Sequence, residues 1–245
     1  MALIGVTAAV VAAVALGVSG IGYRAGWWPL PTAFTIFRWA AYAGAAGAVV
    51  SLAAAVMGRT VRSAVTLGLL GVMLGGVAAV LPWQWQQTAR SVPPIHDITT
   101  DLDDPPGFVA VLPLRANARN SAVHGGATVA AAQRRGYPDL APAMLTLPRD
   151  EAFAAAEQAA RAMGWEIVAV EPGQGLIEAT DTTRWFGFKD DVVIRVREHA
   201  GGSRVDMRSV SRVGGSDVGT NAGRIRAYMA RLTDAVRARD AAGGR

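Results

Sequence analysis

The chain has 245 residues, of which 51% are hydrophobic, and it carries a formal net charge of +5 and no cysteine. The lack of cysteine excludes disulfides, thiol catalysis and cysteine-ligated zinc or iron–sulfur centres. Residues 1–89 contain four arginines and no Asp, Glu or Lys, so the rest of the chain is nearly neutral, with 20 basic and 19 acidic residues. The positive charge therefore gives no argument for a nucleic-acid partner, and we expect none.

Residues 1–85 are expected to form a membrane region. They contain three apolar segments, at about 2–21, 35–57 and 63–82, and each is long enough to cross a hydrocarbon core of roughly 30 Å. A cleavable signal peptide is the alternative for the first segment, but no basic residue precedes it and two more apolar segments follow. We therefore predict three retained transmembrane helices, with the lipid bilayer as their partner.

Glycines and arginines in this region predict its packing and orientation. The Gly71-x-x-x-Gly75 motif allows close helix packing, either among the three helices or between two copies of the chain, so the oligomeric state stays open. Arg59 and Arg62 lie in the short connection between the second and third segments. Because basic loops favour the cytoplasm, we expect the chain after residue 85 to lie on the outer, periplasmic side of a bacterial inner membrane.

A segment rich in proline and aspartate, residues 86–107, is expected to be an extended tether, because its two Pro-Pro pairs disfavour a helix. It carries His96, Asp97, Asp101 and Asp103, and several carboxylates together can hold a hard cation. The spacing does not match a calcium loop, and a capped turn with solvated acids is the other interpretation. We expect no metal and no cofactor, with a site at these four residues as the alternative.

Residues 108–239 are expected to form a soluble domain with four antiparallel strands. Alternating apolar and polar residues predict strands in 165–170 and 176–180, and two more around Val192–Val196 and Val205–Met207. A four-residue loop between the last two would pair Val196 with Val205, Ile194 with Met207, and Arg195 with Asp206. This register places apolar residues on one face and an opposite-charge pair on the other.

Two helices flank these strands. One is predicted to start near Asp150 and to end at Gly164, and the second to start at Thr220 or Asn221 as its N-cap. The expected fold class is α+β, with three transmembrane helices followed by a small domain in which a four-stranded antiparallel sheet packs against two helices. The opposite sheet face should be more polar. Residues 240–245 are expected to be a disordered tail.

Several separated motifs resemble those of a known family. They are PPIHDITTDLDDPPGF, AQRRGYPDLAP, GWEIVAV, GLIEATDTTRWFGFKDDVVIRVR and GSRVDMRSVSRVGGSDVGTNAGRIRAYMARL. Over about Pro93 to Leu232 the chain resembles the domain-of-unknown-function family numbered 1499, and its amino-terminal helices resemble the membrane anchors of some members. The resemblance implies a bacterial domain associated with the cell envelope. It implies no assigned reaction and no catalytic residue.

An aromatic segment between two predicted strands is the first candidate binding site. It comprises Arg184, Trp185, Phe186, Phe188 and Lys189. The rings could enter the membrane interface or hold a lipid or a peptide, with help from the two basic residues. The alternative is that at least two of the rings cover the core of the domain itself.

The start of the last predicted helix is the second candidate. Ser216, Asn221 and Arg224 could bind an anion, because exposed amides at a helix start favour negative charge. Asp217 opposes this interpretation, and helix capping alone would also explain the polar residues. No triad geometry or nucleophile motif is present in the sequence.

Two classes of function follow from these features. The first is a membrane-tethered, non-catalytic module that binds an envelope protein or a lipid, or acts as a scaffold. The alternative is an envelope hydrolase that uses His96 with the neighbouring aspartates, with or without a metal. The sequence favours the first class and identifies no catalytic residue.

Overall fold

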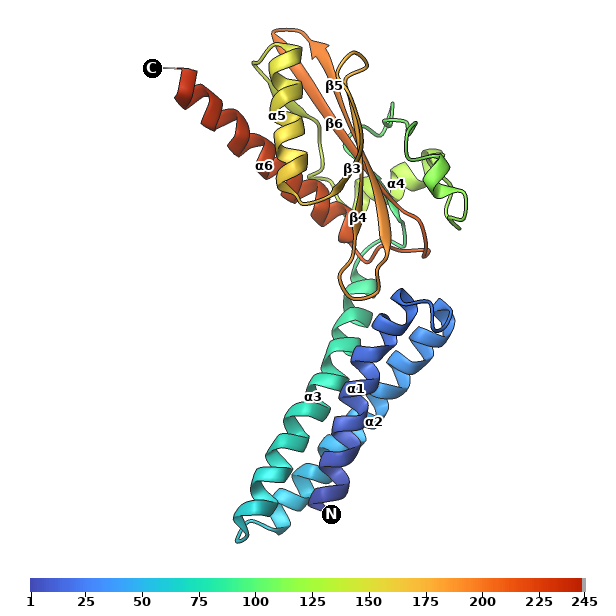
Figure 1. Ribbon diagram of the computed structural model, residues 1–245, viewed down its shortest axis with the longest axis vertical. Helices are drawn as coiled ribbons and strands as arrows, with labels where there is room; N and C mark the ends of the chain where they lie inside the picture. Colours follow the sequence, from blue (N-terminus) through green and yellow to red (C-terminus); the bar gives the residue numbers. More distant parts are fainter. Residues whose placement is uncertain (244–245) are drawn as a thin grey trace. The chain divides into compact units, whose positions relative to one another are not determined.

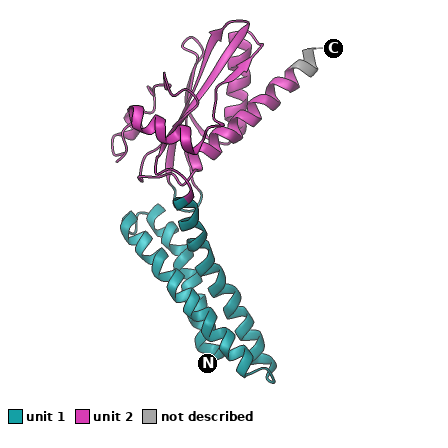
Figure 2. Cartoon of the chain, turned by 180° about the vertical axis from the view of Figure 1, so that it is seen from behind, with its two compact units in different colours: residues 1–90, 184–187 teal, residues 91–183, 188–245 magenta. Residues whose placement is uncertain are grey.

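The computed structural model describes residues 1–243, with side chains described up to Arg239. The chain forms two compact units, coloured separately in Figure 2. Unit 1 contains residues 1–90 together with 184–187, and unit 2 contains residues 91–183 and the chain from 188 onward. Part of the predicted disordered tail, residues 244–245, lies outside the described residues, and the last helix is described to Gly243.

Unit 1 is built from three long helices, α1 (Ala2–Arg24), α2 (Leu30–Met57) and α3 (Arg62–Ser91). All three are long and apolar enough to cross a membrane, which confirms the prediction of three such segments. The third helix continues beyond its apolar part through Gln and Ala, which favour helix. The tether predicted at 86–107 is therefore wrong at its start, because residues 86–91 belong to α3.

Most buried residues of unit 1 are small, and most of its large apolar residues are exposed. Ala9, Ala12 and Ala40 are buried, whereas Leu69 and Met73 are exposed. This is the opposite of a water-soluble bundle, in which large apolar side chains fill the core. It is the distribution expected when the surroundings are lipid and small residues let helix backbones approach closely.

Glycines bring the three backbones together. A Cβ atom built on Gly47 of α2 would lie 2.9 Å from the backbone nitrogen of Ala9 in α1. One built on Gly75 of α3 would lie 2.9 Å from the backbone nitrogen of Ala48 in α2, and would also meet the carbonyl oxygen of Gly44. Both Gly71 and Gly75 of the predicted packing motif thus face other helices of the same chain.

Unit 2 is an antiparallel sheet with helices packed on one face (Figure 1). The strands are β1 (Asp97–Thr99), β2 (Ala143–Leu145), β3 (Glu166–Glu171), β4 (Leu176–Thr182), β5 (Lys189–His199) and β6 (Gly202–Ser211). The helices are α4 (Gly126–Gly136), α5 (Arg149–Ala162) and α6 (Thr220–Gly243), with a short 3-10 turn η1 (Pro113–Arg115). The strand order is β1-β6-β5-β4-β3, and β2 pairs with a different part of β6.

The predicted count of four strands is wrong, because the sheet has six. The four-stranded meander from β3 to β6 is present, but β1 pairs with residues 208–210 and β2 with residues 203–205 on the free side of β6. A free strand edge presents unpaired N–H and C=O groups, and these two short strands satisfy them. Strand β1 lies within the predicted tether, so residues 97–99 are part of the sheet and not of an extended linker.

The predicted register of β5 and β6 is confirmed. Val196 pairs with Val205, Ile194 with Met207, and Arg195 with Asp206. Ile194, Val196, Val205 and Met207 point to the face that α5 and α6 cover, where Ile225, Tyr228 and Leu232 of α6 complete the core. Alanines on α5 let that helix lie close to α6, and the Tyr228 hydroxyl donates a hydrogen bond to the carbonyl oxygen of Ala156 (3.2 Å).

We predict that Gly75→Ala destabilises unit 1 in detergent by about 1–3 kcal/mol, because the new methyl group meets the backbone of α2 at a distance that real Cβ atoms do not adopt. Thermal unfolding of the purified full chain followed by circular dichroism measures the change. Gly76→Ala is the matched control, because a Cβ atom at Gly76 meets nothing within 4 Å. Equal unfolding temperatures for the two variants would contradict the close packing of α2 and α3.

Candidate functional site

The sheet face opposite α5 and α6 carries most of the buried charge of unit 2. Asp191 of β5 is fully buried there and accepts hydrogen bonds from Arg212 Nε (2.8 Å) and Nη2 (2.7 Å) and from the Thr180 hydroxyl (2.7 Å). Arg115, from η1, forms a further ion pair with the same carboxylate. Burial alone would raise the pKa of Asp191, but the hydrogen bonds from Arg212, Thr180 and Arg115 hold it below the ordinary value.

A second buried ion pair fixes β1. Arg208 of β6 contacts both carboxylate oxygens of Asp97 at 2.8 Å. The same guanidinium lies 5.2 Å from the centre of the Phe108 ring and donates to the carbonyl oxygen of Ala122 (2.8 Å). Arg208 therefore links β1 to the loop of residues 100–125 that follows it. Contact with both oxygens of one carboxylate suits the planar guanidinium of an arginine and not the ammonium group of a lysine.

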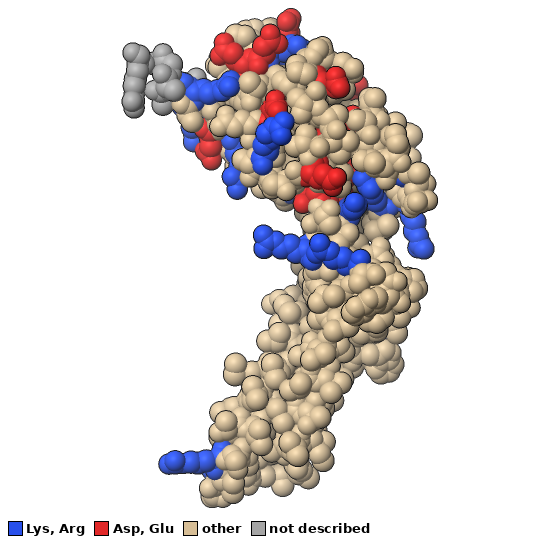
Figure 3. All heavy atoms as spheres, viewed as in Figure 1, with Lys and Arg blue, Asp and Glu red and all other residues tan. Residues whose placement is uncertain are grey.

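Further along the same face, three arginines share three aspartates. The arginines are Arg195, Arg197 and Arg204, and the aspartates are Asp101, Asp104 and Asp206. Burial would raise the pKa of Asp101, but the N–H of Asp104 and the charges of Arg204 and Arg195 lower it. Figure 3 shows charged side chains of both signs over unit 2 and few over the apolar helices.

The residues of the alternative metal site are engaged in other contacts. Asp97 is paired with Arg208 and Asp101 with arginines of β5 and β6. Asp103 lies at the surface and pairs with Arg134 (3.1 Å), while the backbone carbonyl of His96 accepts hydrogen bonds from Ser211 N and Asn221 Nδ2. Within residues 1–239, the structure contains no group of three or more His, Asp or Glu side chains that could hold a metal.

The start of α6 brings Asn221 and Arg224 together, but each binds groups of its own domain. Asn221 donates to Ser211 Oγ (3.0 Å) and accepts from Ser209 Oγ (2.8 Å). Arg224 is buried and pairs with Asp190 (2.7 Å) and Asp181 (2.8 Å). The two residues therefore close the end of the core and present no free donor to an anion in this arrangement.

Asp217 caps the start of α6 with its side chain, so the predicted cap at Thr220 or Asn221 is wrong. Its carboxylate accepts from Gly219 N (3.1 Å) and Asn221 N (2.6 Å), where the first amides of a helix lack partners. Ser216 Oγ accepts from Val218 N (3.1 Å) in the preceding turn. Burial raises the pKa of Asp217, and this carboxylate occupies the position that the anion hypothesis reserved for a ligand.

The aromatic segment, residues 184–189, is divided between the two units. Residues 184–187 belong to unit 1, where Trp185 Nε1 donates to the carbonyl oxygen of Gly17 (2.9 Å) and the ring lies 5.7 Å from Phe37 and Trp85. Phe186 is only 1% exposed and packs among rings from all three helices. The backbone oxygen of Arg184 accepts a hydrogen bond from Arg24 (2.6 Å).

Phe188 and Lys189 belong to unit 2. Phe188 N donates to the Thr183 hydroxyl (2.9 Å), and Lys189 begins β5 with its side chain exposed. The two rings of residues 185–186 thus pack within unit 1.

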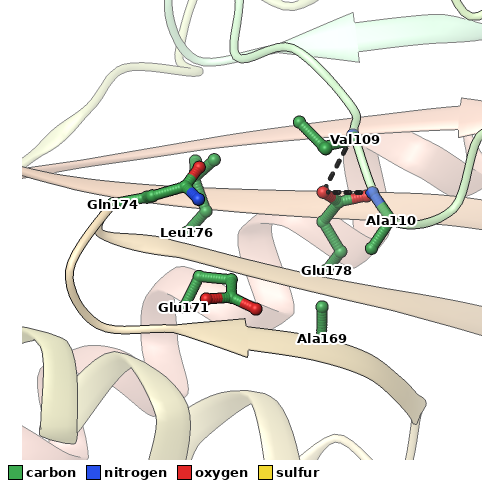
Figure 4. Close-up of a pocket in the computed structure, with 7 residues that line it drawn as sticks. All are labelled: Val109, Ala110, Ala169, Glu171, Gln174, Leu176 and Glu178. Atoms are coloured by element: carbon green, nitrogen blue, oxygen red, sulfur yellow. Dashed lines mark hydrogen bonds between the residues drawn. The ribbon is translucent and has the colours of Figure 1, made fainter.

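The backbone of an apolar turn, residues 108–115, is bound by Glu178 of β4. The carboxylate of Glu178 accepts hydrogen bonds from the backbone N–H groups of Val109 (2.9 Å), Ala110 (3.0 Å) and Val111 (3.0 Å), as Figure 4 shows for the first two. Beside it lies a cavity of about 140 Å³. It is lined by Val109, Ala110, Ala169, Glu171, Gln174, Leu176 and Glu178.

Together, the fold and these surfaces define a membrane-associated α+β protein with three apolar helices before a sheet domain. Residues 97–232 match the family described as "Protein of unknown function (DUF1499)". The match covers more than half of the chain, and the chain therefore belongs to this family, as its motifs predicted. No curated protein and no solved structure matches the chain.

We predict that Asp191→Asn lowers the free energy of unfolding by about 3–5 kcal/mol, because the buried guanidiniums of Arg115 and Arg212 lose their counter-charge. The control, Asp103→Asn, removes an ion pair at the surface and should cost less than about 1 kcal/mol. Denaturant unfolding of the full chain in detergent measures both. A similar small loss for both variants would refute the structural role of Asp191.

The same substitution has a pH signature. The pKa of Asp191 is lower in the folded protein than its ordinary value of 3.8, so its contribution to stability is present above that value and is lost as the pH falls through the folded pKa. Asp191→Asn should therefore reduce the loss of stability below about pH 4, where an unfolded aspartate binds its proton. If the free energy of unfolding falls as steeply below about pH 4 in the variant as in the wild type, other carboxylates determine the loss of stability in acid.

We predict that Trp185→Ala destabilises unit 1 by about 2–4 kcal/mol, because it removes the hydrogen bond to Gly17 and the ring contacts with Phe37 and Trp85. Trp83→Ala, at a mostly exposed ring, is the control. Thermal unfolding in detergent measures both. If Trp185→Ala keeps full stability and instead weakens binding to liposomes or to a partner, the ring serves a ligand and not the helices.

Proposed function

We propose that this protein is a multi-pass protein of a bacterial inner membrane that presents a non-catalytic binding or scaffold domain at the outer, periplasmic face. The three apolar helices support the membrane placement. The orientation is supported by Arg59 and Arg62 in the short connection between α2 and α3, because basic residues in short loops favour the cytoplasm. An odd number of spans then places the two ends of the chain on opposite sides.

One observation carries the non-catalytic part of the proposal: the buried arginines of the sheet domain are each paired with an aspartate. A general acid or base must reach a substrate and must exchange its proton near the working pH. Asp191 and Asp101 instead have lowered pKa values and are held by arginines. These pairs stabilise a loop-covered sheet face, and they leave the hydrolase alternative without a free carboxylate beside His96.

Photo-crosslinking in native membranes tests the proposed function. A crosslinking amino acid at an exposed position of unit 2, such as Leu112 or Met144, is expected to capture the same envelope component in independent preparations. The matched control carries it at Gln158, which is exposed on α5. A protein with a binding surface should give a product at only some of these positions, because interfaces occupy a limited part of a surface.

Two results would contradict the proposal. Stoichiometric metal in the purified protein that is lost on substitution of Asp101 and Asp103 would favour the hydrolase. A reporter fused after Arg245 that is active only in the cytoplasm would refute the orientation and leave the fold unaffected.

A further inference from the structure

The loop that crosses the charged sheet face contains an exposed apolar turn, formed by residues 108–115. Phe108 and Val111 are buried against Val193 and Val210 of the sheet. Between and beyond them, the side chains of Val109, Leu112 and Leu114 point outward and are 60%, 45% and 52% exposed. Among the described residues of unit 2, only Val123 and Met144 are also large, apolar and exposed, so exposed apolar surface is concentrated in this turn.

The turn is held in place at both ends. At its start, Glu178 binds three consecutive backbone N–H groups at 2.9–3.0 Å, as a helix cap would. At its end, Arg115 is buried against Asp191, and Arg212 Nη1 donates to the carbonyl oxygen of Leu114 (2.9 Å). Leu112 and Leu114 therefore stay exposed on an anchored backbone instead of collapsing onto the domain.

The sequence that follows the turn is basic, whereas Glu171 and Glu178 line the cavity beside Val109 and Ala110. Residues 105–138 contain four arginines and no Asp or Glu. Arg119 is exposed, and its backbone N–H donates to the carbonyl oxygen of Arg212 (3.0 Å), which places it beside the end of the turn. Within the described part of the chain, neither Arg119 nor the exposed Arg135 forms an ion pair, so their charge is available to an external anion.

We propose that this apolar turn and its basic surroundings form a docking surface for an anionic lipid bilayer. The inference rests on the proposed function and names the partner that one of its surfaces contacts. Apolar side chains beside arginines match the chemistry of an interfacial segment, in which hydrocarbon enters the acyl boundary and cations meet lipid phosphates. Three apolar side chains bind a membrane only weakly by themselves, but membrane helices in the same chain make the contact intramolecular.

Because the chain has no cysteine, a single label can report the environment of the turn. The full chain is reconstituted in nanodiscs, and a nitroxide is attached at Leu112→Cys, where the exposed side chain tolerates replacement. Its collision rates with dissolved oxygen, which enriches in lipid, and with a water-soluble nickel complex are compared. Gln158→Cys on α5 is the matched control.

In nanodiscs with phosphatidylglycerol, the ratio of oxygen to nickel collisions at residue 112 is expected to exceed that at residue 158 by at least about twofold. The ratio should fall in phosphatidylcholine nanodiscs and in Arg119→Glu. Raising the salt from about 0.1 M to about 1 M should lower it too, because the Debye length shortens from about 10 Å to about 3 Å. Leu114→Cys serves as a second label site if Leu112→Cys alters the fold.

A nickel collision rate at residue 112 equal to that at residue 158 in both kinds of nanodisc would overturn the proposal. Protection of residue 112 in native membranes but not in nanodiscs would also overturn it, in favour of a protein partner. That second result would leave the proposed binding function intact. Failure of the proposed binding function would be seen separately, as the absence of any crosslinked component in native membranes.

Discussion

The ion pairs of Asp191 are the interaction on which the sheet domain most depends. This fully buried carboxylate joins β5 to Arg212, which follows β6, and to Arg115, which ends the apolar turn. A charge without water must be compensated by nearby charges and hydrogen bonds, or its burial costs several kcal/mol, on the order of the whole stability of a domain. The two arginines supply that compensation, and by doing so they fix a loop that has little apolar surface of its own inside the core.

The interiors of the two units are filled by side chains of different size. In unit 2, large side chains such as Tyr228 and Met207 fill the core, and removal of apolar surface from water stabilises it. In unit 1, glycine and alanine lie inside and larger residues face outward, so close backbone contact takes the place of hydrophobic burial. Trp185 and Phe186 are an exception within unit 1, because their rings join an aromatic cluster with Phe37 and Trp85.

Strong periodicity made part of the fold predictable. The register of β5 and β6 follows from alternation over ten residues and from glycines at the turn, and the apolar helices follow from length and composition. Strands β1 and β2 have three residues each, too few to show a period, and they depend on the free edge of β6. The candidate sites were harder to predict, because Arg115 and Asp191 are 76 residues apart and the sequence gives no sign of their pairing.

The position of β1 has a consequence for biosynthesis. Its residues 97–99 find their hydrogen-bond partners only at residues 208–210, more than a hundred positions later. A growing chain therefore cannot close the sheet edge until β6 has left the ribosome, whereas the hairpin of β5 and β6 needs only adjacent residues. Completion of the sheet thus comes late in synthesis, after residue 210 has been added, whereas the β5–β6 hairpin can form as soon as its own residues are available.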